Sequence, residues 1–184
     1  MATVNTWYGA ISSQLFERLQ QIRLVVCDVD GVFSDGCIYL GNDGEELKAF
    51  HTRDGFGVKA LLNAGIDVAV ITGRESRIVQ DRMQALGVKH IYQGQADKEA
   101  CFEQLVAQLG LTYDHVASIG DDVPDLAMLT RSAVGVCVND GHPYVQQQAD
   151  YITSARGGSG AVRELSDLIL TAQGQLQLQG GISL

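Results

Sequence analysis

The stretch Leu24-Val25-Val26-Cys27-Asp28-Val29-Asp30-Gly31 joins an apolar run to two carboxylates, one residue apart, and a glycine. The apolar run predicts a strand, and strand side chains alternate between two faces, so Asp28 and Asp30 would share a face if the strand continued. Two neighbouring carboxylates repel each other unless a cation or a proton intervenes. The stretch therefore predicts a strand that ends at a cation-binding site.

Strand-like and helix-like segments alternate through the rest of the chain. The expected strands span 22–27, 67–71, 90–92, 116–119 and 133–138, and the expected helices span 58–63, 75–86, 98–109, 124–129, 143–148 and 161–172. This alternation predicts a parallel sheet covered by helices on both faces. The expected fold class is α/β, a Rossmann-like doubly wound sheet, in a single domain spanning residues 1–184.

Three segments stand outside this alternation. Residues 37–50 contain the turn Gly41-Asn42-Asp43-Gly44 between two strand-like runs, which predicts a β-hairpin inserted after the first strand. Residues 173–184 are rich in Gln and Gly, and we expect a mobile tail there. A helix is expected within residues 1–20 because apolar side chains recur at every fourth position, namely Trp7, Ile11, Leu15 and Leu19.

Composition narrows the class of protein. The formal net charge of −9 argues against a nucleic-acid partner, although a bound metal can invert the local charge at a site for a small phosphorylated substrate. No apolar stretch is long enough to span a bilayer, and the N-terminus lacks a signal-peptide pattern. The four cysteines show no zinc-ligand spacing. We therefore expect a cytoplasmic protein with no membrane partner.

Polar groups follow the expected strands where ligands bind in open parallel sheets. These groups are Thr72-Gly73-Arg74, Lys98 at a helix start, and Gly120-Asp121-Asp122-Val123-Pro124-Asp125. Asp28, Asp30 and Asp121 offer oxygen ligands that suit magnesium, with Asp122 or Asp125 in support. A carboxylate can also act as a nucleophile on phosphorus, while Thr72 and Lys98 can bind a phosphoryl group.

Each of these residues alone has a simpler explanation. The two aspartates could form a turn, Thr72 could cap a helix, and the later aspartates could favour a helix N-terminus. One capping residue, however, explains only one aspartate. A lysine in the first turn of a helix faces the positive end of the dipole; a surface lysine is the common case, but an anion at that position would account for Lys98.

Taken in order, Asp28-x-Asp30-Gly31, Thr72, Lys98 and Gly120-Asp121-Asp122-x-x-Asp125 resemble the four motifs of the haloacid dehalogenase-like phosphatases. The resemblance implies that Asp28 is the nucleophile, that Asp30 is the general acid and then the base, and that an aspartyl-phosphate forms. It also implies a magnesium site made by the Asp28 side chain, the Asp30 backbone carbonyl and Asp121, with Asp122 beside them.

The spacing between motifs leaves no room for the cap domain that most members of this family carry. An uncapped site is open to water, and a neighbouring subunit paired through the hairpin would cover it. The layout resembles a capless branch of the family through stretches such as Arg53-Asp54-Gly55-Phe56-Gly57 and Gly157-Gly158-Ser159-Gly160. This resemblance implies a homotetramer with active sites near subunit interfaces, acting on an eight-carbon sugar acid phosphate in lipopolysaccharide synthesis.

Such a substrate carries a carboxylate and a phosphate, so cations besides the metal are expected. Arg74 and Arg82 suit bidentate carboxylate binding. The resemblance implies that Arg82 acts across a subunit interface. By resemblance, Asp30, Lys98, Lys59 and the loop His51-Thr52-Arg53-Asp54-Gly55 also line the substrate site, and residues 156–160 approach a neighbour's site. Lys59 and Arg82 could equally form ordinary surface ion pairs.

Two other functions remain open at this point. One is a phosphatase for a nine-carbon, sialic acid-type 9-phosphate, which relative activities on the two substrates would separate. The other is a catalytically silent tetrameric assembly module. Silent relatives typically lack one of the two motif aspartates, whereas Asp28 and Asp30 are both present here.

Overall fold

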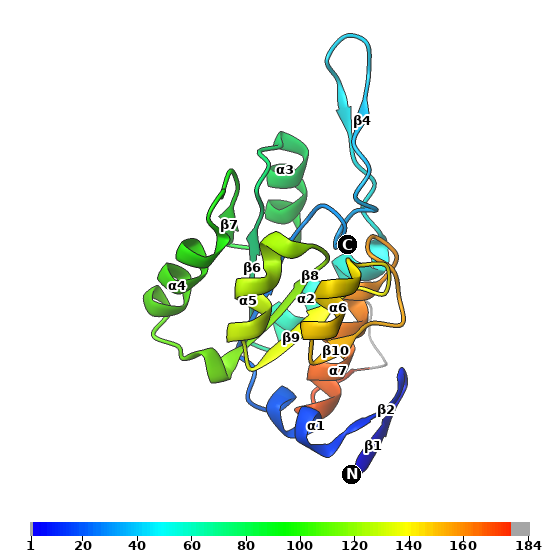
Figure 1. Ribbon diagram of the computed structural model, residues 1–184, viewed down its shortest axis with the longest axis vertical. Helices are drawn as coiled ribbons and strands as arrows, with labels where there is room; N and C mark the ends of the chain where they lie inside the picture. Colours follow the sequence, from blue (N-terminus) through cyan, green and yellow to red (C-terminus); the bar gives the residue numbers. More distant parts are fainter. Residues whose placement is uncertain (1, 178–184) are drawn as a thin grey trace.

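A six-stranded parallel sheet forms the centre of the computed structural model, which describes residues 2–177. The strands lie in the order β10-β9-β8-β3-β6-β7, with helices on both sides of the sheet (Figure 1). Their bounds are β3 (Leu24–Cys27), β6 (Asp67–Ile71), β7 (His90–Tyr92), β8 (Val116–Gly120), β9 (Val134–Cys137) and β10 (Tyr151–Ile152). The predicted doubly wound α/β architecture is confirmed.

The alternation of side chains along β3 divides the core into two parts. Val25 and Cys27 pack with α1, α2, α3 and α7, whereas Leu24 and Val26 pack with α4 and α5 on the opposite face. Both faces of the central strand are therefore apolar. The helices are α1 (Ser13–Leu19), α2 (Thr52–Asn63), α3 (Arg77–Leu86), α4 (Lys98–Gln108), α5 (Leu126–Arg131), α6 (Pro143–Gln148) and α7 (Ala161–Ala172), with short 3-10 turns η1 (Tyr113–His115) and η2 (Val123–Asp125).

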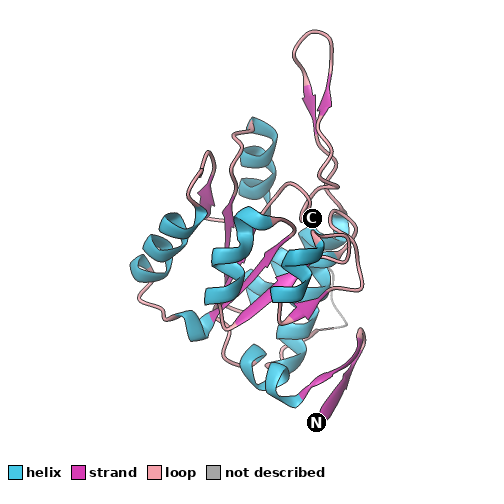
Figure 2. Cartoon of the chain, viewed as in Figure 1, coloured by secondary structure: helices cyan, strands magenta, loops and turns pink. Residues whose placement is uncertain are grey.

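The predicted insertion after the first strand is a hairpin that projects from the body of the molecule (Figures 1 and 2). Its paired strands, β4 (Tyr39–Leu40) and β5 (Glu46–Leu47), are shorter than predicted. Large apolar side chains on this hairpin are exposed, namely Ile38, Tyr39, Leu40 and Leu47.

The N-terminal prediction is wrong in part. Strands β1 (Thr3–Thr6) and β2 (Gly9–Ser12) form an antiparallel hairpin before α1, so the helix begins only at Ser13. The Ser12 hydroxyl accepts the backbone N–H of Leu15 at 3.1 Å and caps this helix. Ile11, Leu15 and Leu19 are buried as the spacing predicted, but Trp7 lies 73% exposed between the two strands. A spacing of four residues did not separate a strand followed by a helix from one helix.

The C-terminal segment is partly anchored. The Gln173 side-chain amide donates to the backbone carbonyls of Ile22 (2.8 Å) and Leu19 (3.3 Å). The mobility of the tail stays a prediction, and residues 178–184 lie outside the described residues. Within residues 2–177 the longest helices have 12 residues, and none is both long and apolar enough to cross a bilayer.

Candidate active site

The predicted motif residues meet at the carboxyl ends of the central strands. Asp28 follows β3, Thr72 follows β6, Asp121 follows β8, and Lys98 is the first residue of α4. All four line one open pocket of about 420 Å³, together with Asp30 and Arg74. Because parallel strands place their carboxyl ends at the same edge, residues far apart in the sequence form one site here.

The chain turns sharply immediately after Asp28. The Val29 carbonyl accepts backbone N–H groups from Val32 (3.2 Å), Phe33 (2.9 Å) and Ser34 (3.1 Å). The Asp28 N–H still donates to the Ile119 carbonyl of β8 at 3.1 Å, so Asp28 stays aligned with the sheet. The strand therefore does not continue to Asp30, so Asp28 and Asp30 do not share a strand face.

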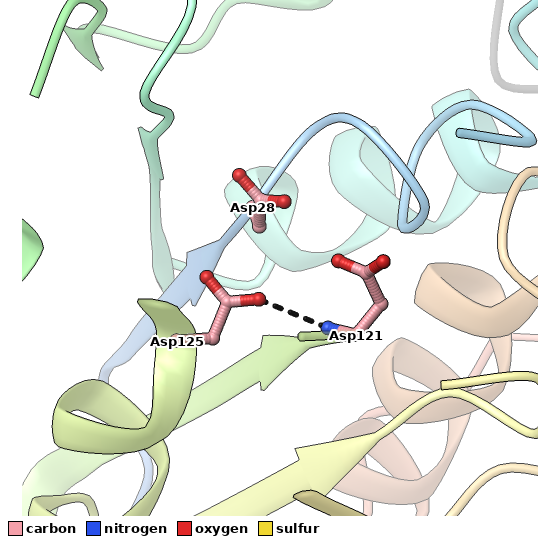
Figure 3. A group of neighbouring side chains, drawn as sticks. All are labelled: Asp28, Asp121 and Asp125. Carbon is pink, nitrogen blue, oxygen red and sulfur yellow. Dashed lines mark hydrogen bonds between the residues drawn. The ribbon is translucent and has the colours of Figure 1, made fainter. Parts of the chain in front are cut away.

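Three carboxylates gather in the pocket. Oxygen atoms of Asp28, Asp121 and Asp125 all lie within 4.8 Å of one another (Figure 3). Asp125 is held in place because its Oδ2 accepts the backbone N–H groups of Asp121 (3.0 Å) and Asp122 (3.2 Å). The Asp122 side chain instead accepts the N–H of Val123 at 2.8 Å and is exposed. Of the two supporting aspartates that the sequence analysis named, Asp125 lies in the carboxylate cluster, whereas Asp122 lines the pocket outside that cluster.

One lysine faces this cluster. Lys98 Nζ donates to Asp28 Oδ1 and to Asp125 Oδ1, both at 2.7 Å, and the lysine is 7% exposed. Burial alone would lower the pKa of Lys98, but the Asp28 and Asp125 carboxylates outweigh burial and raise it. The anion that the sequence analysis expected beside this helix start is therefore present within the chain itself.

The cluster carries more negative charge than Lys98 can neutralise. Burial, followed by the charges of Asp28 and Asp125, raises the pKa of Asp121 to about 8. Burial and the charge of Asp125 also raise the pKa of Asp28, although Lys98 opposes them. Buried carboxylate oxygens with this excess charge fit a hard divalent cation such as magnesium.

Asp30 faces a second group of charges at the base of the hairpin. Its carboxylate accepts a hydrogen bond from Lys48 Nζ, and Arg74 Nε lies 3.9 Å from Asp30 Oδ2. Glu46 completes this group, 3.5 Å from Arg74 Nη2. Lys48 and Glu46 were missed by the sequence analysis. Their spacing of two residues within the predicted hairpin was the available signal, because it places both on one face of a strand.

Much of the predicted substrate-binding set lies elsewhere in this chain. His51 caps α2 by accepting the N–H of Arg53 at 3.1 Å, so residues 52–55 are the first helical turn and not a loop. Asp54 is 1% exposed and accepts the N–H groups of Gly160 (3.2 Å) and Arg163 (3.0 Å). Asp54 therefore caps α7 in this chain, and its role as a substrate ligand stays a prediction.

The two remaining predicted cations also lie away from the pocket. Arg82 packs on the first turn of α2, where a Cβ added to Gly55 would lie 2.6 Å from Arg82 Nη2. Lys59 lines a separate cavity of about 360 Å³ that includes Gly65 and Asp67, at the amino end of β6. Within the described chain, only three of the predicted substrate-binding residues line the carboxylate pocket: Asp30, Arg74 and Lys98.

The glycine-rich segment 156–160 packs against its own chain. The Gly158 N–H donates to the Val32 carbonyl at 2.8 Å, and a Cβ on Gly157 would lie 1.7 Å from the Gly31 carbonyl oxygen. Asp140 accepts the Gly157 N–H at 2.8 Å. The segment thus supports the turn that carries Asp30, a contact that the sequence analysis did not predict.

Comparison with known proteins identifies the family. Residues 84–165 match the haloacid dehalogenase-like hydrolase family. Over 183 residues the chain is 47% identical to the 3-deoxy-D-manno-octulosonate 8-phosphate phosphatase of Yersinia pestis, covering 100% of this chain and 98% of that protein. The chain belongs to the 3-deoxy-D-manno-octulosonate 8-phosphate phosphatase family.

Solved structures of this phosphatase family share the fold described above. The Yersinia pestis crystal structure matches with a TM-score of 0.96 at 47% identity, covering 100% of this chain and 99% of that one. A Moraxella catarrhalis phosphatase, solved in complex with a magnesium ion, a phosphate ion and a KDO molecule, matches with a TM-score of 0.86 at 43% identity, covering 88% and 92% of the two chains. The haloacid dehalogenase-like fold implied by the motif resemblance is confirmed, and so is the absence of a cap domain, which the motif spacing predicted.

Proposed function

We propose that this chain is a magnesium-dependent phosphatase that hydrolyses 3-deoxy-D-manno-octulosonate 8-phosphate to the free sugar acid and phosphate, in the cytoplasm and for lipopolysaccharide synthesis. The convergence of Asp28, Thr72, Lys98 and Asp121 in one pocket carries this proposal. The family relationship indicates the substrate, and the residues of the pocket are those that phosphoryl transfer needs.

Asp28 is the proposed nucleophile. Its carboxylate oxygen forms a bond to phosphorus while the bond from phosphorus to the sugar oxygen breaks, and Asp30 gives its proton to that leaving oxygen. Asp30, now a carboxylate, takes a proton from water, and the water oxygen attacks phosphorus and breaks the bond to Asp28. Thr72 donates a hydrogen bond to a phosphoryl oxygen, and Lys98 balances the negative charge of the transition state.

Magnesium fits the carboxylate cluster. Asp28, Asp121 and the Asp30 backbone carbonyl are the proposed ligands, and Asp125 supports them through its hydrogen bonds to the backbone of Asp121 and Asp122. When bound, the ion shields the repulsion between the Asp28 carboxylate and the phosphate dianion. The raised pKa of Asp121, about 8, supports this assignment: burial is its main cause, and a cation would offset the further contribution of the Asp28 and Asp125 charges. Asp122 remains a predicted residue of the metal site, and its backbone N–H donates to Asp125 Oδ2.

A homotetramer is the proposed assembly. The exposed apolar side chains of the hairpin would be covered if hairpins from several subunits packed together. The pocket is open, and Arg82 lies outside it in its own chain, so a neighbouring subunit is its proposed route to a substrate carboxylate. The same route is proposed for His51, Thr52, Arg53 and Lys59.

Phosphate release from a panel of sugar phosphates tests this function. We expect release from the eight-carbon substrate with magnesium and none with a chelator, and Asp28→Asn should abolish turnover while the far-ultraviolet circular dichroism stays unchanged. Asp114→Asn, which removes an exposed carboxylate before β8, is the matched control and should stay active. A clear preference for a nine-carbon 9-phosphate would replace the proposed substrate. A wild type that releases no phosphate from any sugar phosphate of the panel would support the alternative of a catalytically silent assembly module.

A further inference from the structure

Lys48 is a buried cation beside the active site that the mechanism above does not use. Its side chain is 0% exposed, its Nζ donates to Asp30 Oδ1, and Nζ lies 3.6 Å from Glu46 Oε1. A buried ammonium group is costly unless carboxylates pair with it. The position of Lys48 is therefore determined by Asp30 and Glu46, and not by solvent.

We infer that Lys48 is a positioning residue that holds the Asp30 carboxyl group in the geometry needed for proton transfer. This inference rests on the proposed phosphatase function. Each of the two motif aspartates then has its own lysine, since Lys98 holds Asp28 at 2.7 Å and Lys48 holds Asp30. Lys48 does not line the carboxylate pocket, so it acts through Asp30 and not on the substrate.

Asp30 needs such a contact more than Asp28 does. Asp28 lies at the end of a sheet strand, whereas Asp30 lies in an irregular turn after that strand. The other cation near Asp30 is Arg74, whose side chain is 47% exposed and whose Nε lies 3.9 Å away. An exposed pair at that distance contributes little to fixing a side chain. Lys48 is thus the main restraint on the Asp30 carboxyl among the contacts of the described chain.

The leaving group distinguishes a positioning role from general support of the fold. A sugar alkoxide is a poor leaving group and needs the proton from Asp30, whereas 4-nitrophenolate departs without one. The ratio kcat/KM reports the steps up to release of the first product, which include this proton transfer. Loss of Lys48 should therefore lower kcat/KM for the sugar phosphate more than kcat/KM for 4-nitrophenyl phosphate.

The experiment measures both kcat/KM values, with magnesium, in wild type, Lys48→Met, Lys48→Arg and the control Lys89→Met. Lys89 is an exposed lysine at the opposite edge of the sheet. For each variant we divide kcat/KM for the sugar phosphate by kcat/KM for 4-nitrophenyl phosphate. We expect this quotient to be at least about tenfold lower in Lys48→Met than in wild type, because general acid catalysis typically raises rates by about 10² to 10⁴. Lys48→Arg should recover most of the loss, and Lys89→Met should match wild type.

An unchanged quotient, with both values lowered in parallel or neither lowered, would overturn the inference while leaving the proposed function intact. A wild type without activity on the sugar phosphate would instead refute the proposed function. The quotient is taken within one preparation, so a partly unfolded variant does not distort it. If Lys48→Met gives no folded protein, Lys48→Gln is measured in the same way.

Discussion

Replacing Lys98 by Met tests the electrostatic balance of the pocket. The substitution keeps most of the aliphatic stem and removes the ammonium group, which leaves Asp28 and Asp125 without the donor that each now has at 2.7 Å. Removing one partner of a buried ion pair costs about 3–5 kcal/mol. Because Lys98 is 7% exposed, solvent screening reduces this figure little.

We expect the free energy of unfolding of Lys98→Met to fall by about 3–5 kcal/mol in chelator, measured by urea denaturation. For a chain of this size such a loss corresponds to a melting temperature lower by about 6–20 °C. Asp125→Asn removes one of the two carboxylate charges, on Asp28 and Asp125, that the loss of Lys98 leaves unpaired. The double variant should therefore be more stable than Lys98→Met by about 1 kcal/mol or more, which a double-mutant cycle detects.

Activity should respond differently from stability. Lys98 balances charge in the transition state, so turnover should be lost in Lys98→Met and should not return in the double variant, even where stability does. Stability of Lys98→Met within about 1 kcal/mol of wild type would refute the electrostatic reasoning, since buried pairs of this kind cost several times more to break. Recovery of turnover in the double variant would refute the transition-state role.

Three further changes test other parts of the molecule. Gly157→Ala places a Cβ 1.7 Å from the Gly31 carbonyl oxygen. We therefore expect the free energy of unfolding to fall by about 1–3 kcal/mol and turnover to be lower. Ser159→Ala, at an exposed neighbouring position, should change neither. Asp54→Ala removes the cap of α7 and should lower the free energy of unfolding by about 1–2 kcal/mol. A large rise in KM with unchanged stability would instead support the predicted role of Asp54 as a substrate ligand. In chelator, the free energy of unfolding should fall as pH rises from about 4 to about 8, because folded Asp121 (pKa about 8) retains a proton that the unfolded chain releases near 3.8. Magnesium should flatten this slope by taking the place of the proton, and a flat profile in chelator would contradict the raised pKa.

The ends of the secondary structure elements were predictable to different degrees. β6, β7, α6 and α7 begin and end where the apolar pattern and the glycines predicted. α2 begins at Thr52 and not at Val58, because the His51 side chain caps a start whose residues 52–57 contain two glycines and show little apolar periodicity. The N-terminal hairpin was missed because Trp7 and Ile11 continue the four-residue spacing of Leu15 and Leu19, although Trp7 is exposed.

The sequence by itself determined five of the six sheet strands, the sheet edge that carries the site, and the four motif groups, because strand and helix periodicity are local and parallel strands always end at a common edge. The two-residue strand β10 was not predicted, because it is too short to show a period. Only the tertiary structure decided which side chain meets which. Lys98 and Asp28 are 70 residues apart, and Asp54 and Gly160 are 106 apart, so no local pattern encodes either contact. The choice of Asp125 over Asp122 for the carboxylate cluster depends on the conformation of the turn after β8, and the contact of Lys48 with Asp30 depends on where the second strand of the hairpin returns to the body. Such contacts arise from packing between distant elements, and they decide which of several similar charges reaches the reacting atoms.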